Sequence, residues 1–368
     1  MELQKRPALV PAGLITGIAV LALVAALLVG WSTSRYGIGV SPDSAHYIGV
    51  ARSLGLGHGL WFNGAPYTHW PPIYPLLLAG VGAVGLDPLN GARLLAILLY
   101  PLNLVLASCL AYHLSDRSTY AGIAAGLLYL ASPELLHIHM IALSEPPFLC
   151  LTFLSLLLFC QPGAHRARWQ LAAAGLCAGG ALLTRYAGAA LLPAFVLCIA
   201  ASGRTGERRP LREALTFLCA ACSPLAGWLL YTRLAEHAAS DRPLVFHAPG
   251  GMAIMLLPLS ALGTVWLARS FRQARRCETS DAETILSLWI PAFLTTYCAF
   301  VFFSICFLDA LTPVDAHSVT GAGIRRTGGD AVDMAGRVHK RPGTRALRHP
   351  KGTRRPPDEK CASGVRSN

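Results

Sequence analysis

The residues best equipped for chemistry lie in a polar interval between the first two long apolar segments. This interval contains S-P-D-S-A-H-Y-I-G-V-A-R-S-L (41–54) and G-A-P-Y-T-H-W-P-P-I-Y-P (64–75). Carboxylate, imidazole, phenol and guanidinium groups are all present there, whereas the surrounding chain is mostly apolar. Ionisable groups beside membrane segments usually mark the site of a polar substrate. The interval is therefore the first candidate for a functional site.

Asp43 is the first candidate catalytic residue. It follows Pro42 at the expected start of a helix, so it can act as the N-cap of that helix. Its functional role would be to take a proton from an acceptor or to hold a metal ion. The two roles do not exclude each other. Tyr47 lies one helical turn further on and faces the same side. It is expected either to line a substrate site or to sit in the aromatic belt of the membrane interface.

Glu145 is the second candidate catalytic residue, at the start of an apolar segment in A-L-S-E-P-P-F (142–148). A carboxylate in a first helical turn stabilises the helix by about 0.3–1 kcal/mol, which is the purely structural interpretation. Near hydrocarbon, however, a carboxylate needs a partner. Two carboxylates from separate elements can hold one divalent cation, so Asp43 and Glu145 are also the candidate metal ligands. A divalent metal ion is the one cofactor considered.

Arg185 lies between two apolar segments and is the candidate ligand for a phosphate group, because the planar guanidinium matches phosphate oxygens. The alternative is an internal ion pair with Asp43 or Glu145. A lone His-x-His at His137 and His139 is poor support for a metal site. The remaining candidate substrate-binding residues are Tyr67, His69, Tyr186 and His247.

The elements that position these residues must be membrane-spanning helices. Of the 368 residues, 54% are hydrophobic and only 14% are charged, against about 25% charged in soluble domains. A spanning helix needs about 20 apolar residues. The sequence predicts an all-α, polytopic membrane protein with about nine spans, at 12–31, 92–114, 118–136, 145–160, 169–183, 186–202, 214–232, 252–268 and 284–307.

Charge distribution predicts the topology of these spans. Basic clusters at residues 5–6, 166–168, 204–212 and 269–276 should face the cytoplasm. Consistent alternation requires that the apolar stretch 72–86 is an interfacial or re-entrant helix, one of the juxtamembrane helices of a first outer loop at 32–91. The predicted protein is therefore a multi-pass protein of the plasma (inner) membrane. Its candidate site residues all face the extracytoplasmic side, and membrane lipid is an expected partner.

The end of the chain differs in composition from the rest. Residues 317–368 hold 12 of the 31 Lys and Arg residues and few large apolar side chains. Such a segment is expected to be disordered. The sequence thus divides into a membrane domain at 1–315 and a basic tail at 316–368, which is interpreted as an aberrant or truncated C-terminus. A nucleic-acid partner is not expected, because the other basic residues form short clusters between apolar segments.

The outer motifs resemble those of GT-C glycosyltransferases, specifically the family 39-like group of protein O-mannosyltransferases and aminoarabinose transferases. D-S-A-H-Y-I-G-V-A-R-S-L is similar to the D-x-x-x-Y-x-x-x-A start of that group's first outer loop, and H-W-P-P-I-Y-P to its aromatic-Pro-Pro-x-Y-P segment. G-A-R-L-L, A-L-S-E-P-P-F and A-L-L-T-R-Y-A-G resemble its later motifs. D-A-L-T-P-V-D-A resembles its D-x-R-Y-L-x-P segment but departs from it after Asp315.

The resemblance implies a GT-C fold and the transfer of a sugar from a polyprenyl-phosphate donor to a lipid, glycan or protein acceptor at the outer face. It also implies a second acidic group at the position of Glu145. Two alternatives stay open: a transporter or flippase for a polar or lipid-linked solute, and a truncated, inactive homologue.

Overall fold

The computed structural model describes residues 10–68, 70–160, 168–202, 210–236, 265–266, 268–269 and 288–303. Much of the predicted span 252–268 and the whole basic tail 316–368 lie outside these described residues. The described part is almost entirely helical, as the sequence predicts, with one short hairpin.

The helices and strands follow the predicted apolar segments. The N-terminal part contains α1 (Ala12–Ser32), α2 (Pro42–Gly55), β1 (Trp61–Phe62), β2 (Ala65–Pro66), α3 (Ile73–Gly82) and α4 (Pro88–Leu114). The central part contains α5 (Thr119–Ala131), α6 (Pro133–His139), α7 (Glu145–Phe159) and α8 (Arg168–Leu182). The remainder contains a 3-10 helix, η1 (Tyr186–Ala190), then α9 (Leu191–Ser202), α10 (Pro210–Glu236) and α13 (Ile290–Phe303).

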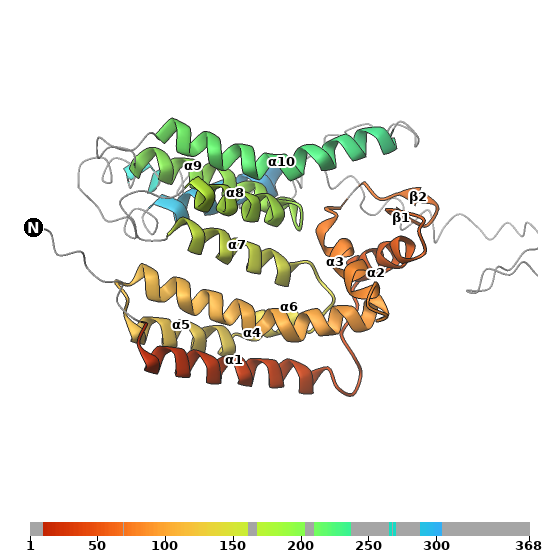
Figure 1. Cartoon of the computed structure of the whole chain (residues 1–368), viewed down its shortest axis with the longest axis horizontal. Coiled ribbons are helices and arrows are strands. Elements are labelled where there is room, and N and C mark those ends of the chain that lie inside the picture. The colour runs from red at the N-terminus through yellow and green to blue at the C-terminus, as the bar shows by residue number, and fades with distance from the viewer. Residues whose placement is uncertain are drawn as a thin grey trace, which may run out of the picture. The chain divides into compact units, whose positions relative to one another are not determined.

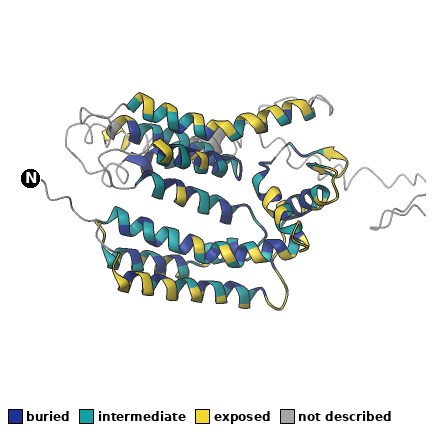
Figure 2. Cartoon of the chain, in the orientation of Figure 1, coloured by how far each residue is buried: buried dark blue, intermediate teal, exposed yellow. Residues whose placement is uncertain are grey.

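The outer helices present apolar side chains away from the protein. Figure 2 shows long exposed faces along α1 and α10. Large aliphatic side chains such as Leu23 and Leu27 of α1, and Leu230 and Leu234 of α10, are more than 60% exposed. Large exposed apolar surfaces mark contacts with a membrane or another protein. On helices as long and apolar as these, lipid is the expected contact.

Three of the described helices are long and apolar enough to cross a membrane, namely α1, α4 and α10. A fourth crossing results if α5 and α6 are counted together as one bent span. The helices α7, α8, α9 and α13 have 15, 15, 12 and 14 residues, fewer than the roughly 20 of a straight crossing. The chain is thus a multi-pass helical protein, and the count of nine spans stays a prediction.

The predicted single span at 118–136 is wrong in one respect. The chain breaks after α5, and α6 turns away from it by 64°. Pro133 has no amide hydrogen and its ring disfavours a helical conformation in Ser132. Ser132 ends α5 and its hydroxyl accepts a hydrogen bond from the amide of Leu135, so the same residue caps α6.

Small residues allow α8 and α10 to pack closely. A Cβ added to Gly175 would meet the carbonyl oxygen of Phe217, and one added to Gly179 would meet that of Ala221. Close approach of this kind compensates for the weak hydrophobic drive between helices in lipid. The Thr184–Arg185 turn directly follows α8, one of the two helices of this pair.

The polar segments gather at one end of the helices. Figure 1 shows α2, α3 and the β1–β2 hairpin beside one end of α4 and beyond the ends of α7 and α8. The amide of Ile73 donates to the carbonyl of Leu183 at 3.1 Å, and the Tyr231 hydroxyl donates to the carbonyl of Leu60 at 3.1 Å. A short parallel bridge pairs Gly39 with Ile141. These contacts bring residues 39–68, 70–75, 139–147, 183–190 and 228–231 together at the same end.

Candidate functional site

An ion pair forms the centre of this end. The Nη1 atom of Arg185 lies 2.6 Å from Oε1 of Glu145 and donates a hydrogen bond to the Ser144 hydroxyl at 3.3 Å. The two side chains are partly buried, with exposed fractions of 36% and 26%. The internal ion pair considered for Arg185 is therefore present. The Nε and Nη2 atoms of Arg185 make no hydrogen bond to any residue in the described ranges. Among these residues, one edge of the guanidinium therefore stays available to a ligand.

Ser144 joins this pair to Tyr47. The two hydroxyl oxygens lie 3.4 Å apart, and both side chains are buried. Because Tyr47 is only 4% exposed, it does not belong to a lipid-facing aromatic belt. Its ring packs edge-on against Tyr74 at a centroid distance of 5.2 Å. Ser144 lies in the motif A-L-S-E-P-P-F, but neither Ser144 nor Tyr74 can be recognised as a site residue from the sequence alone.

The pKa of Tyr47 shows which charges surround its hydroxyl. Burial raises this pKa, whereas the hydrogen bond to Ser144 lowers it. The carboxylate of Asp43 raises it, Arg185 lowers it and Glu145 raises it again. All three charged candidates thus lie close enough to act on one phenol. Tyr47 stays protonated at neutral pH and can donate a hydrogen bond.

Asp43 is exposed and does not cap its helix. The N-cap of α2 is Ser41, whose hydroxyl accepts from the amide of Ser44, while the Ser44 hydroxyl accepts from the amide of Ser41. This capping box satisfies the helix start without Asp43. The capping interpretation of Asp43 is therefore wrong. Asp43 occupies the first turn with its carboxylate exposed.

Two buried polar atoms in the site have no hydrogen-bond partner in the part of the chain that the structure describes. They are the hydroxyl oxygen of Tyr67 and the Oε2 atom of Glu145. Burial raises the pKa of Tyr67, and the nearby Tyr47, Tyr186 and Asp43 raise it further. Buried polar groups normally have partners. The Glu145 atom belongs to the ion pair, and a bound polar group or water could satisfy each of the two atoms.

Tyr186 is fixed at the edge of the site. Its hydroxyl accepts a hydrogen bond from Nε1 of Trp228 at 3.2 Å. Trp228 stacks on Tyr231, which in turn holds the loop before the hairpin through the carbonyl of Leu60. A Cβ on Gly188 would overlap the backbone of Leu182, so only glycine lets the chain turn back here after Arg185.

The structure does not test the predicted substrate-binding histidines. His69 and His247 lie outside the described residues. His139 is fully buried and bonded to protein atoms, and no group of three or more His, Cys, Asp or Glu residues in the described ranges could hold a metal ion.

The carboxylates do not fit a divalent ion as they are arranged. Oε1 of Glu145 is already neutralised by Arg185, whose positive charge opposes a cation on the same carboxylate. Oε2 of Glu145 and the exposed Asp43 are the remaining carboxylate oxygens of the two candidates, so water or phosphate would have to supply most ligands of a divalent ion. Metal dependence stays a prediction, and no step of the reaction is derived through a metal.

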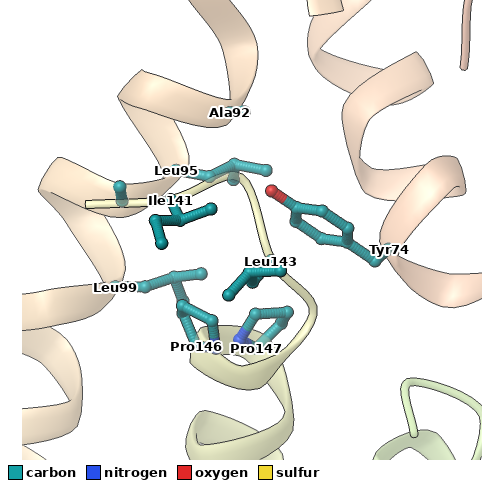
Figure 3. Close-up of a pocket in the computed structure, with 9 residues that line it drawn as sticks. Tyr74, Ala92, Leu95, Leu99, Ile141, Leu143, Pro146 and Pro147 are labelled. Carbon is teal, nitrogen blue, oxygen red and sulfur yellow. The ribbon is translucent and has the colours of Figure 1, made fainter. Parts of the chain in front are cut away.

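A small apolar crevice lies beside the ion pair. It is lined by Tyr74 of α3, by Ala92, Leu95, Ala96 and Leu99 of α4, and by Ile141, Leu143, Pro146 and Pro147. Figure 3 shows the phenol of Tyr74 facing Leu143 and the two prolines that follow Glu145. The arrangement places hydrocarbon surface next to charged groups.

One protein family matches part of the chain, including most of its charged end. Residues 69–231 match the model of the family described as dolichyl-phosphate-mannose-protein mannosyltransferase. The match covers Glu145, Arg185 and Tyr186, but not Asp43 or Tyr47. Over these residues it confirms the resemblance that the motifs predicted.

Two solved structures are similar to the chain. Both are of ArnT from Cupriavidus metallidurans, one bound to undecaprenyl phosphate and one in the apo state. Identity is 18% and 17%, with TM-scores of 0.49 and 0.48. In each case 83% of this chain is covered, against 64% and 62% of the ArnT chain. The chain thus spans less than two thirds of their length. Comparison with curated proteins gives no match.

Proposed function

We propose that this chain is a membrane glycosyltransferase that moves a sugar from a polyprenyl-phosphate donor to a lipid, glycan or protein acceptor. The observation that carries the proposal is the guanidinium of Arg185. Ser144 and Glu145 hold it, and one of its edges makes no hydrogen bond to the described residues. A guanidinium fixed in this way is a preorganised ligand for phosphate oxygens. The match to the mannosyltransferase family supports the same chemistry.

The site has both parts that such a donor requires. The donor phosphate would bind at Arg185, and the phenol of Tyr67, whose hydroxyl has no partner within the described ranges, would donate to a sugar or phosphate oxygen. The lipid chain would begin at the apolar crevice beside Pro146 and Pro147. ArnT, to which the chain is similar, has been solved with undecaprenyl phosphate bound.

Asp43 is the proposed general base. Its exposed carboxylate would accept the proton of the acceptor hydroxyl as that oxygen forms a bond to the anomeric carbon of the sugar. The bond from this carbon to the phosphate oxygen breaks, and the electron pair leaves with the polyprenyl phosphate. Arg185 would stabilise the negative charge on that leaving group. Glu145 keeps Arg185 in place.

The side of the membrane is part of the proposal. The basic clusters predict that the end carrying Asp43, Glu145 and Arg185 is extracytoplasmic and that the membrane is the plasma membrane. A transporter or flippase is less well supported, because Asp43, Glu145 and Arg185 lie at the ends of helices rather than in the middle of spans. Such a protein would also yield no glycosylated product.

Binding of undecaprenyl phosphate to the full chain in detergent tests the proposal. Arg185→Gln should weaken binding at least about tenfold, the loss of one charged hydrogen bond. The matched control is Arg52→Gln, which removes another arginine from an ion pair, with Asp87. That pair is exposed, so its loss should leave binding unchanged. Equal affinity of the wild type and Arg185→Gln would refute the assignment of the phosphate ligand.

A further inference from the structure

A buried amide lies behind the site, on the spanning helix α4. Asn103 is 0% exposed. Its Nδ2 atom donates to the carbonyl oxygen of Pro146 at 2.9 Å and to Nε2 of His139 at 3.2 Å. An amide nitrogen carries two hydrogens, so both are used. The side chain thus connects α4 to the first turn of α7 and to the end of α6.

The hydrogen bonds also determine the form of His139. Because Nε2 accepts a hydrogen bond from Asn103, the imidazole hydrogen must be on Nδ1. Nδ1 lies 2.7 Å from the carbonyl oxygen of Leu135 and donates to it. The ring is fully buried and packs against Tyr100 at a centroid distance of 4.9 Å. His139 is therefore a neutral, immobile acceptor that fixes the orientation of the Asn103 amide.

The start of α7 needs this external support. The N-cap residue Ser144 makes no capping hydrogen bond, because its hydroxyl is engaged with Tyr47 and Arg185. The next residues of the helix include Pro146 and Pro147, which have no amide hydrogens for a cap to satisfy. Ser144 and Glu145 thus stand at the start of a helix that lacks the usual side-chain cap.

We propose that Asn103, oriented by His139, is a positioning residue for the candidate site. By holding the carbonyl of Pro146, it fixes the adjoining Ser144 and Glu145 and, through them, the guanidinium of Arg185. Neither Asn103 nor His139 touches the bound ligand. The effect on ligand binding rests on the proposed function, whereas the effect on the position of Ser144 does not.

Ligand selectivity separates positioning from a general structural role. The probes are undecaprenyl phosphate and uncharged undecaprenol, each titrated into the full chain in detergent. Asn103→Leu removes both donated hydrogen bonds with little change in volume, and His139→Phe removes the acceptor. His139→Gln restores an acceptor near the position of Nε2. The matched control is Ser108→Ala, which trims another fully buried polar side chain of α4.

The proposal expects Asn103→Leu and His139→Phe to weaken undecaprenyl phosphate binding about tenfold, with undecaprenol binding unchanged. His139→Gln should recover most of the loss, and Ser108→Ala should show none. Equal loss for both lipids would indicate a disturbed fold and would overturn the proposal. If the wild type binds undecaprenyl phosphate, unchanged binding by Asn103→Leu and His139→Phe would also overturn it.

A second measurement does not depend on the lipid. In a Ser144→Cys background, the side chain at this position should react slowly with a maleimide, because Ser144 is 1% exposed. Peptide mass spectrometry reports labelling at position 144 separately from the native cysteines. Adding Asn103→Leu should raise the labelling rate about tenfold, because a segment that has lost a hydrogen bond opens locally more often. Adding Ser108→Ala should leave the rate unchanged.

The two measurements distinguish the two proposals. If wild-type protein does not bind undecaprenyl phosphate but Asn103→Leu exposes position 144, the proposed function fails and the positioning role stands. If the labelling rate does not change with Asn103→Leu, the positioning role is refuted whatever the lipid result.

Discussion

The carboxylate of Glu145 and the guanidinium of Arg185 meet at 2.6 Å, although one begins α7 and the other lies in the turn between α8 and η1. Ser144 adds a hydrogen bond to the same Nη1 atom and approaches the hydroxyl of Tyr47. This contact joins three separate elements, so the charge pair holds the site together.

Removing both members of the pair should cost less stability than the sum of the two single removals. Arg185→Gln or Glu145→Gln leaves a partly buried charge without its partner, at a cost of about 1.5–3 kcal/mol. The double variant Glu145→Gln/Arg185→Gln should lose less than the sum of the two single variants. Thermal unfolding in detergent measures all three. Additive losses would show that the pair is not coupled.

Substitutions at Asp43 and at Ser41 should separate the effect on activity from the effect on stability. Asp43→Asn is expected to lower sugar transfer in membranes about 10²–10⁴-fold, the contribution typical of a general base. Its effect on unfolding should be within about 0.5 kcal/mol, because the side chain is exposed and does not cap α2. Ser41→Ala should do the reverse and cost about 1 kcal/mol through the lost cap. Full transfer activity in Asp43→Asn would remove the catalytic assignment.

Tyr67→Phe should raise stability at neutral pH and weaken function. The change removes a buried hydroxyl that has no partner among the described residues, whose desolvation costs about 1–3 kcal/mol. If that hydroxyl serves the donor, transfer and donor binding should fall. If Tyr67→Phe lowers stability instead, the hydroxyl has a hydrogen-bond partner within the protein.

Alkaline pH should unfold the wild type more readily than Tyr67→Phe. Burial raises the folded-state pKa of Tyr67 above the value of about 10 in unfolded chains. Between these two values the unfolded state releases a proton that the folded state keeps, so the free energy of unfolding falls as pH rises above about 10. The phenylalanine variant lacks this group and should show a shallower fall in unfolding titrations between pH 8 and 11. Parallel curves would contradict the buried, protonated state of Tyr67.

Gly179→Leu should disrupt the contact of α8 with α10. A side chain at this position meets the backbone of Ala221, which cannot move aside as a flexible side chain could. Overpacking costs about 1–3 kcal/mol or more. The control is Gly227→Ala on α10, where an added Cβ meets nothing within 4 Å. It should be neutral or stabilise by up to about 1 kcal/mol. Equal yields of folded, monodisperse protein for both variants would contradict the packing.

The sequence predicts the fold where local patterns decide it. The segments predicted at 12–31 and 145–160 correspond closely to α1 and α7, because continuous apolar runs with clear polar ends leave little choice. The sequence does not predict the break between α5 and α6 despite Pro133, because composition alone makes 118–136 apolar enough for a span. Helices shorter than a full crossing, such as α9, cannot be recognised from hydropathy, since bends and 3-10 turns depend on packing.

The site is only partly accessible to sequence reasoning. Glu145 and Arg185 stand out as isolated charges between apolar segments, and their ion pair was among the alternatives. The network around them could not be predicted, because Ser144, Tyr74 and Asn103 are ordinary residues until tertiary contacts bring them together. The catalytic, substrate-binding and metal-binding roles assigned to individual residues stay predictions.

The two prolines at the start of α7 change how this end of the helix can attract anions. A helix ordinarily offers several free amide hydrogens at its N-terminus, and these bind negative groups without any help from side chains. Pro146 and Pro147 remove two of those donors directly beside Glu145. Under the proposed function, affinity for a negatively charged headgroup at this entrance would come from the long, replaceable side chain of Arg185 instead. A single substitution there can abolish or retune it while the main chain stays as it is.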